Sequence, residues 1–330
     1  MSANITRKPI VNSPSRRTEG QSYHLEELIL LFLESIEIER AVSHYTVRNY
    51  HFYLRRFTAW FTDATGSDDI GKLNLPVVRK YRVYLSRYSD KKGRTLSRVT
   101  QSYHVIALRS FLKWLVKNDY DVLPPDKIDL PKGESRSINF LSRTQVERLM
   151  DQPSLSKPQG MRDKVILEML FSTGMRVSEL VGLNRDQVDL ERREFGIIGK
   201  GGRARVVFLS KRAADWVARY LVSRTDHWRP LFTRFSRGAD EPQSDGETMR
   251  LTTRTVQRIV EKYRKKAGLA QRITPHGLRH SFATDLLHAG AGLREVQEML
   301  GHKNIATTQI YTHVTNPQLR RVHEEFHGKS

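Results

Sequence analysis

Hydrophobic residues recur at helical spacing through the first third of the chain, after a polar start. Residues 1–22 contain two prolines and little apolar content, which predicts a disordered basic arm. Four apolar stripes with intervals of three and four residues follow, and they predict four amphipathic helices. The stripes are Leu25, Leu28, Phe32 and Ile36; Val47, Tyr50, Leu54, Phe57 and Phe61; Val78, Tyr81, Leu85 and Tyr88; and Val105, Leu108, Leu112 and Leu115. Residues 23–120 are therefore expected to form a small helical domain with these stripes as its core.

The pattern changes after residue 120. Prolines and a glycine make residues 121–139 a predicted linker. Residues 140–316 are expected to form a second domain, which opens with a capping box formed by Ser142 and Gln145. It continues with a helix that Gly174 ends, a β-hairpin of strands 195–199 and 205–209, and helices near 212–222, 252–267, 275–288 and 293–300. The acidic segment 236–250 is predicted to be an exposed loop, and residues 317–330 a tail that docks on a neighbouring protomer. The expected fold is mainly α with a small β-hairpin.

Composition narrows the class of partner. The 330 residues, 38% of them hydrophobic, suffice for two cores. The formal net charge of +20 points to a polyanion. The chain has no cysteine, which excludes disulfides, thiolate nucleophiles and Cys-based zinc sites. Its longest apolar run, residues 28–33, is too short to cross a bilayer, and its start lacks the apolar core of a signal peptide. We expect a cytoplasmic, nucleoid-associated protein without a membrane partner.

The positive charge is concentrated between residues 79 and 117. This stretch holds eleven Lys and Arg residues against one acid, Asp90, with tyrosines interleaved. A solvated helical face is the simple alternative, but so one-sided a balance favours a nucleic-acid surface. The candidate DNA-binding residues are Arg79, Lys80, Lys91, Lys92, Arg94 and Arg98.

Six residues in the second domain carry candidate chemistry. They are Arg176, Lys200, His276, Arg279, His302 and Tyr311. Each alone has an ordinary interpretation, as a surface arginine, a turn lysine or a core tyrosine. Together they provide what phosphoryl transfer through a tyrosine needs without a metal: cations to neutralise a phosphodiester, and arginine forks that match two phosphate oxygens.

The local spacing refines these roles. Glu179 lies three residues after Arg176, on the same helical face, and can orient it. His276 and Arg279 project from one face at the start of a helix, where an anion is favoured. His276 and His280 also have the spacing of a zinc pair, but no glutamate lies between them and Arg279 would repel a cation. We therefore predict no metal and no cofactor, and assign His280 a structural role.

The chain resembles the tyrosine recombinase (phage integrase) family, and within it the Xer site-specific recombinases. The similarity runs from about residue 25 to the end and rests on the segments 174–183, 199–201, 275–284, 300–302 and 307–314. The family pattern of arginine, lysine, His-x-x-Arg, histidine and tyrosine is met in full by the six residues. The chain departs from the Xer pattern after Gly201, in the length of the 236–250 loop and in its N-terminal arm.

The resemblance implies a C-shaped clamp around double-stranded DNA, with a SAM-like core-binding domain and a catalytic domain. It also implies that Tyr311 attacks a scissile phosphate to give a 3′-phosphotyrosine, while Arg176, Arg279 and His302 hold the phosphate. His276 would then assist deprotonation of Tyr311, and Lys200 would protonate the leaving 5′-oxygen. Strand exchange would pass through a Holliday junction in a homotetramer or a heterotetramer, with an FtsK-type translocase as a possible activator and dimer resolution as the role.

Three alternatives remain at this point. A type IB topoisomerase religates the same strand as a monomer and makes no Holliday junction. A mobile-element integrase shares the core and differs in its DNA site. A non-catalytic DNA-binding protein on the same scaffold would have lost a catalytic residue, and all six are present.

Overall fold

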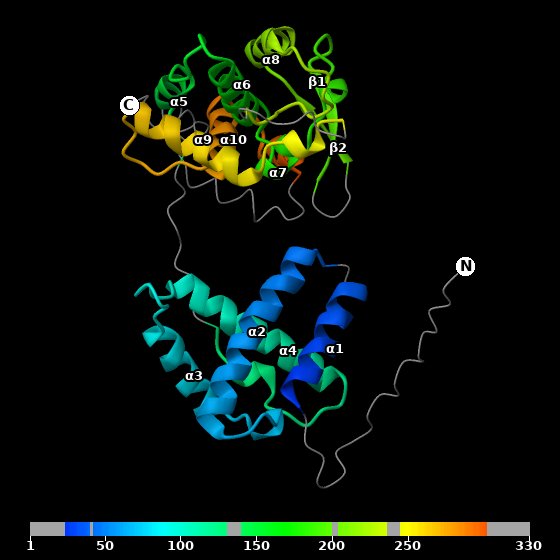
Figure 1. The fold of residues 1–330 in the computed structure, drawn as a ribbon, viewed down its shortest axis with the longest axis vertical. Helices are drawn as coiled ribbons and strands as arrows, with labels where there is room; N and C mark the ends of the chain where they lie inside the picture. The colour runs from blue at the N-terminus through cyan, green and yellow to red at the C-terminus, as the bar shows by residue number, and fades with distance from the viewer. Residues whose placement is uncertain (1–23, 40–41, 131–139, 200–203, 236–244, 302–330) are drawn as a thin grey trace, which may run out of the picture. The chain divides into compact units, whose positions relative to one another are not determined.

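The computed structural model describes residues 24–39, 42–130, 140–199, 204–235 and 245–301. The chain divides into two compact units, residues 1–135 and 136–330. Figure 1 shows the first unit as helical and the second as helices with one small sheet. This is the mainly α fold with a β-hairpin that the sequence predicts.

The first unit is built from the four predicted helices. Side-chain caps begin two of them: Asn74 accepts a hydrogen bond from the backbone N–H of Val77, and Ser97 accepts one from that of Thr100. Gly66, in the left-handed conformation, ends the second helix. The elements are α1 (Leu25–Ile38), α2 (His44–Thr65), η1 (Ile70–Lys72), α3 (Leu75–Arg87), α4 (Arg98–Lys117) and η2 (Pro125–Lys127).

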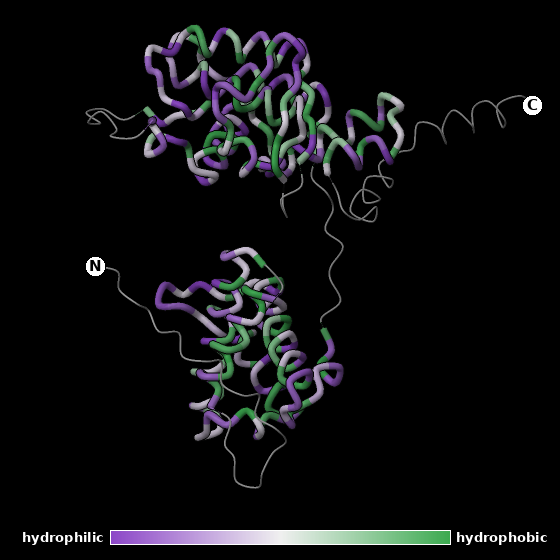
Figure 2. Tube along the Cα trace, turned by 90° about the vertical axis from the view of Figure 1, so that its right-hand side faces the viewer, coloured by the Kyte–Doolittle hydropathy of each residue, from purple (hydrophilic) through white to green (hydrophobic). Residues whose placement is uncertain are grey.

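The core of the first unit follows the predicted stripes. Phe32, Phe57, Phe61 and Tyr81 are at most 1% exposed, and Phe57 meets Tyr81 edge to face with ring centroids 5.1 Å apart. Figure 2 shows apolar stretches along the helices of this unit alternating with polar ones. The aromatic stripes are therefore core, as their spacing indicates.

The second unit surrounds one buried helix, α6, which packs against α8 and α10. The capping box predicted at Ser142 and Gln145 is present at the start of α5. The elements are α5 (Arg143–Met150), α6 (Pro158–Thr173), α7 (Val177–Gly182), η3 (Arg185–Gln187), β1 (Glu194–Ile198), β2 (Ala204–Phe208), α8 (Lys211–Ser223), η4 (Glu247–Met249), α9 (Thr253–Lys266), α10 (Pro275–His288) and α11 (Leu293–Leu300).

The sheet of the second unit is the predicted hairpin. β1 and β2 pair antiparallel, with Glu194 opposite Phe208 and Ile198 opposite Ala204. Phe195 and Ile197 point into the core while their neighbours Gly196 and Ile198 are exposed, the alternation of a half-buried strand. Residues 200–203, between the strands, lie outside the described part of the chain.

Two segments differ from the sequence prediction. In the predicted acidic loop, residues 236–244 lie outside the described part, but the rest is not a free loop. Met249 is buried, and Arg250 donates hydrogen bonds to the carbonyl oxygens of Val181 and Leu183 at the end of α7. In the predicted linker, Val122 and Ile128 are buried in the core of the first unit. Met249 and the hydrogen bonds of Arg250 anchor the first segment, and two apolar side chains anchor the second.

Candidate active site

A tight turn between α6 and α7 places the first candidate, Arg176. Gly174 ends α6 with φ +58°, in the left-handed region, and a Cβ there would lie 2.3 Å from the ring of Phe282 on α10. Only glycine fits both constraints. Arg176 then occupies the N-cap position of α7. The turn thus places Arg176 beside the start of α7 and close to α10.

Glu179 binds Arg176 twice. Its Oε1 accepts a hydrogen bond from Nη1 of Arg176 at 2.9 Å, and its Oε2 accepts one from the backbone N–H of the same residue at 2.8 Å. The Glu179 side chain is only 5% exposed, whereas that of Arg176 is 33% exposed. The contact predicted from the three-residue spacing is present, and it leaves part of the Arg176 guanidinium open to solvent.

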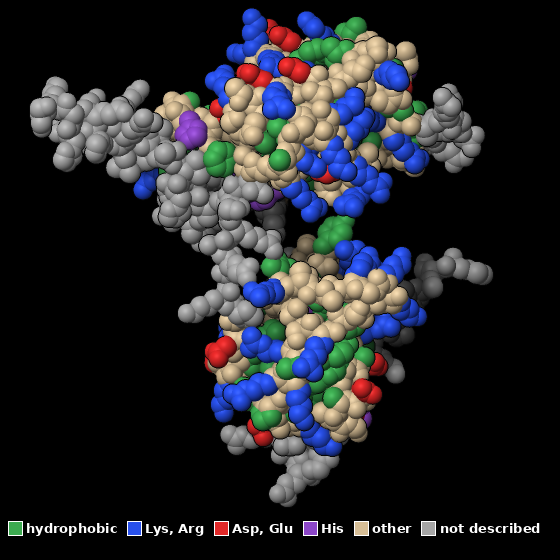
Figure 3. Space-filling model, turned by 90° about the vertical axis from the view of Figure 1, so that its left-hand side faces the viewer, with side chains coloured by type: hydrophobic (Ala, Val, Ile, Leu, Met, Phe, Trp, Pro, Cys, Tyr) green, Lys and Arg blue, Asp and Glu red, His purple; other side chains and the backbone are tan. Residues whose placement is uncertain are grey.

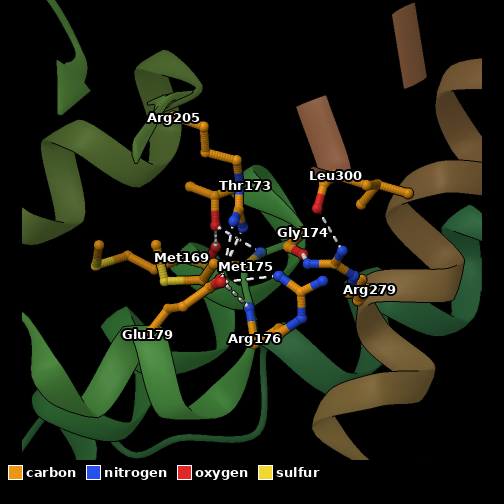
Figure 4. A network of polar contacts seen from close by, with 9 residues as sticks. All are labelled: Met169, Thr173, Gly174, Met175, Arg176, Glu179, Arg205, Arg279 and Leu300. Carbon is orange, nitrogen blue, oxygen red and sulfur yellow. Dashed lines mark hydrogen bonds and ion pairs between the residues drawn. The ribbon is translucent and has the colours of Figure 1, made fainter. Parts of the chain in front are cut away.

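Arg205 on β2 binds the same carboxylate, which sequence analysis did not foresee. Its Nη1 and Nη2 donate to Oε1 and Oε2 of Glu179 at 3.0 and 2.7 Å. Figure 4 shows the two arginines approaching Glu179 from different elements. Burial by itself would raise the pKa of Glu179, but the hydrogen bonds from Arg205 and from Arg176 outweigh it and lower this pKa. Glu179 is therefore an anion held between two cations.

Arg279 on α10 lies at the same turn. Its Nη1 donates to the carbonyl oxygen of Gly174 at 2.8 Å, and its Nη2 donates to that of Leu300 at 2.6 Å. The residue is 2% exposed. Arg279 therefore ties α10 both to the turn that leads into Arg176 and to the end of α11.

His276 occupies the first turn of α10, where Thr274 caps the helix and Pro275 stands at its first position, as predicted. The residue is exposed, and its ring meets that of His280 edge-on, with centroids 4.2 Å apart. Partial desolvation, together with the positive charges of Arg279 and Arg176, lowers the pKa of His276 from its ordinary 6.5. At neutral pH the imidazole is thus uncharged and able to accept a proton.

Three of the predicted residues, Lys200, His302 and Tyr311, lie outside the described residues. The segments that lead to them are described. β1 ends at Ile198, two residues before Lys200, and α11 ends with Gly301 in the left-handed conformation, one residue before His302. Arg279 holds the carbonyl of Leu300, so the end of α11 is bound directly to a candidate catalytic side chain.

A basic groove runs along α9 to His276. Its cationic lining repeats at helical spacing on α9 and continues beyond the helix, and one carboxylate, Glu261, interrupts it. The groove has a volume of about 620 Å³. A spacing of three and four residues between the cations was the signal in the sequence that could have found this face. The cations are Arg254, Arg258, Lys262, Lys265 and Arg272.

The candidate DNA-binding residues of the first unit are exposed. Arg79 and Lys80 lie on α3, and Arg98 begins α4. Arg94 lies between these helices and forms an ion pair with Asp90 at 2.7 Å, so part of its charge is offset. Figure 3 shows Lys and Arg side chains spread over the visible face of each unit, with few acidic side chains among them.

Neither metal ligands nor membrane helices are found in the described ranges. Within them, no group of three or more His, Cys, Asp or Glu side chains is placed to hold a metal ion. The helices described there include none that is long and apolar enough to cross a membrane.

Both units match family models. Residues 29–119 match the phage integrase N-terminal SAM-like domain, and residues 139–317 match the phage integrase family model. The second match contains Arg176 and Arg279 as well as Tyr311. The chain belongs to the phage integrase family of tyrosine recombinases. This membership supports site-specific DNA recombination as its activity.

Similar proteins span nearly the whole chain. It is 36% identical over 317 residues to the tyrosine recombinase XerD of Lacticaseibacillus casei, covering 92% of this chain and 99% of that one. It is 34% identical to the tyrosine recombinase XerC of Pelotomaculum thermopropionicum, covering 91% and 97%.

Solved structures show the same fold. The XerH site-specific recombinase bound to a palindromic difH substrate has a TM-score of 0.67 at 23% identity, covering 90% of this chain and 84% of that one. The Tn1549 transposon integrase in complex with transposon right end DNA has a TM-score of 0.69 at 20% identity, covering 90% and 98%.

Proposed function

We propose that the protein cuts and rejoins double-stranded DNA at specific sites through a covalent bond to Tyr311. The observation that carries this proposal is the meeting of Arg176, Arg279 and His276 at one turn, where Arg279 binds the carbonyl of Gly174, 105 residues before it in the sequence. The two arginines can stabilise the negative charge of a phosphodiester. The uncharged imidazole beside them can accept the proton of the attacking tyrosine.

The proposed roles follow from the chemistry of each group. Arg176, which is partly exposed, binds a non-bridging phosphate oxygen directly. Arg279 supplies the second positive charge from a buried position, where a charge acts through a lower dielectric constant. His302, one residue beyond the end of α11, adds a third donor to the phosphate.

Proton transfers complete the cleavage step. The pKa of a tyrosine is ordinarily about 10, so Tyr311 needs a base at neutral pH, and the uncharged His276 is assigned that role. The oxygen of Tyr311 bonds to phosphorus as the bond to the 5′-oxygen breaks. Lys200 gives that oxygen its proton, which leaves a 3′-phosphotyrosine and a free 5′-hydroxyl.

Rejoining reverses the same step with a hydroxyl from a second duplex. The phosphotyrosine bond conserves the energy of the phosphodiester, so the proposed reaction consumes no nucleotide and uses no metal. Two successive strand exchanges pass through a Holliday junction, for which we propose a tetramer of one or two kinds of recombinase clamped around two DNA sites. As the biological role we propose the resolution of chromosome or plasmid dimers in the cytoplasm. An FtsK-type translocase would be the activator.

A trapping experiment tests the proposal. A DNA site is first selected from random-sequence duplexes by binding to the wild-type protein, and a nick is then placed beside the cleavage point so that the cut strand diffuses away. The wild-type protein should form a slow-migrating band in a denaturing gel, also in excess EDTA and without nucleotide. Tyr311→Phe should bind the duplex equally and give no band. An adduct of equal yield from the phenylalanine variant, or an adduct that requires added metal, would contradict the proposed mechanism.

A further inference from the structure

Arg205 reaches the candidate active site from the hairpin that carries Lys200. Its guanidinium forms a two-point contact with both oxygens of Glu179, and its side chain is only 12% exposed. Among the described residues, Glu179 is its hydrogen-bonding partner, and its Nε is buried without one. Both of these hydrogen bonds go to one carboxylate, in the bidentate geometry of a strong arginine–carboxylate pair.

The charge balance shows what Arg205 changes. Glu179 alone, paired with Arg176, would make a neutral ion pair, and its negative charge would also repel an approaching phosphate. With Arg205 on the same carboxylate, two positive charges share one negative charge. The cluster then keeps a net charge of about +1 for the phosphate, and in a partly buried site this difference is poorly screened.

Arg205 also contacts the segment that leads to His302. A Cβ on Gly301 would lie 3.1 Å from Cδ of Arg205 and 3.3 Å from its Nη1. The backbone at the end of α11 therefore runs directly over the Arg205 side chain. One residue thus links β2, which follows Lys200, with Glu179 beside Arg176 and with Gly301 beside His302.

We propose that Arg205 is a positioning residue for DNA cleavage, which holds the Glu179 carboxylate on Arg176 and offsets the charge of that carboxylate, so that Arg176 keeps its positive charge for binding the phosphate oxygens. The inference rests on the proposed function, because it assigns Arg205 a part in the same reaction. In this proposal Arg205 acts through Glu179, so its contribution is to the rate of cleavage and not to the nucleophile itself.

The test uses the nicked duplex described above under single-turnover conditions. Arg205→Met should slow adduct formation by roughly 10- to 100-fold, somewhat less than the loss of a direct oxyanion donor. In the double variant Arg205→Met with Glu179→Gln, the uncompensated negative charge is gone. This double variant should cut faster than Arg205→Met alone, a non-additive recovery that loss of packing cannot give.

Two further variants test whether the loss of any ion pair or of side-chain packing in this unit slows cleavage. Arg212→Met removes an arginine from another ion pair of the same unit, in which Nε of Arg212 lies 2.8 Å from Glu168, and it should cut at the wild-type rate. Arg205→Lys keeps the charge but not the two-point contact, and it should stay within about tenfold of the wild type. If the methionine variant does not fold, a folded Arg205→Lys that is slowed by much more than about tenfold overturns the charge-sharing role.

The outcomes separate the two proposals. If the wild-type protein forms no adduct at all, the proposed function is wrong, and with it the role of Arg205. If the wild-type protein reacts and Arg205→Met matches it, only the inference on Arg205 is overturned. A folded Arg205→Lys that is as slow as Arg205→Met, or a double variant slower than Arg205→Met, overturns the charge-sharing role as well.

Discussion

At the scale of single residues, the Glu179 carboxylate connects two elements of the candidate site, because Arg176 and Arg205 both bind it. The pair formed by Arg176 and Glu179 follows from a three-residue spacing and is present. The contact between Arg205 and Glu179 joins residues 26 positions apart, and no local pattern encodes it. Burial of Arg279 could not be predicted either, because it depends on the carbonyl of Leu300 at the end of another helix.

Lys200 permits a chemical test of general acid catalysis. Lys200→Ala should slow cleavage by roughly 10²- to 10⁴-fold, the range typical of a lost general acid. Replacing the 5′-bridging oxygen by sulfur should restore nearly the wild-type rate, because a thiolate leaves without a proton. Arg176→Ala serves as the control and should not recover, since its role concerns the non-bridging oxygens. If sulfur does not rescue the lysine variant, Lys200 only positions the DNA.

His276 links the rate to pH. Its pKa is lowered below the ordinary 6.5, so the ring remains unprotonated down to a pH below that value, and cleavage should fall only when the pH drops through the lowered pKa. Removing a nearby positive charge with Arg176→Ala should move the pKa of His276 back up, as measured by NMR titration of labelled histidine. Arg212→Ala should leave it unchanged. An unchanged pKa in Arg176→Ala would mean that Arg176 does not lower it, and a His276 pKa that is not below 6.5 in the wild-type protein would contradict its role as an uncharged base.

At the scale of elements, periodicity and capping predicted most of the architecture. The helices expected near 275–288 and 293–300 were predicted with the correct ends, because Thr274, Pro275 and Gly301 mark them. The basic groove along α9 was overlooked, although its cations recur at helical spacing. The spacing places them on one face of the helix, but only the packing of α9 beside the start of α10 brings that face to His276.

The turn that presents Arg176 should tolerate no side chain. Gly174→Ala places a methyl group 2.3 Å from Phe282 in a left-handed conformation, whereas Gly66→Ala has the same kind of φ with nothing within 4 Å. Gly66→Ala should cost about 1–2 kcal/mol, the penalty of that conformation alone. Gly174→Ala should cost several kcal/mol in addition because of the clash. Denaturant unfolding of both variants measures the difference, and equal losses would mean that α10 yields easily around this turn.

At the scale of the whole molecule, positive charge lies on both units, on exposed residues of the first and along α9 in the second. Composition predicted a polyanionic partner, and the family supports DNA. Sequence analysis expected both units to hold the DNA, but it named basic surface residues in the first unit alone and did not name the cations of α9.

The salt dependence of DNA affinity can show whether the basic residues of each unit contact phosphates. Each phosphate contact contributes about −0.9 to the log–log slope of affinity against salt. Changing Arg79, Lys91, Lys92 and Arg94 to glutamine should flatten the slope, and so should changing Arg254, Arg258 and Lys265. The two effects should add, because the sites are on different units. Glutamine at Lys157, Arg192 and Lys211, outside the groove, is the matched control and should change little. A slope unchanged in either set would show that its surface does not contact DNA.

The most direct test of the account is to find the atom that becomes joined to DNA. The trapped adduct is digested with a protease and a nuclease, and the residue that carries the remaining nucleotide is located by tandem mass spectrometry. The account predicts a single modified peptide with a 3′-linked nucleotide on the oxygen of Tyr311. A nucleotide linked through its 5′ end, or attached to any other residue, would contradict it.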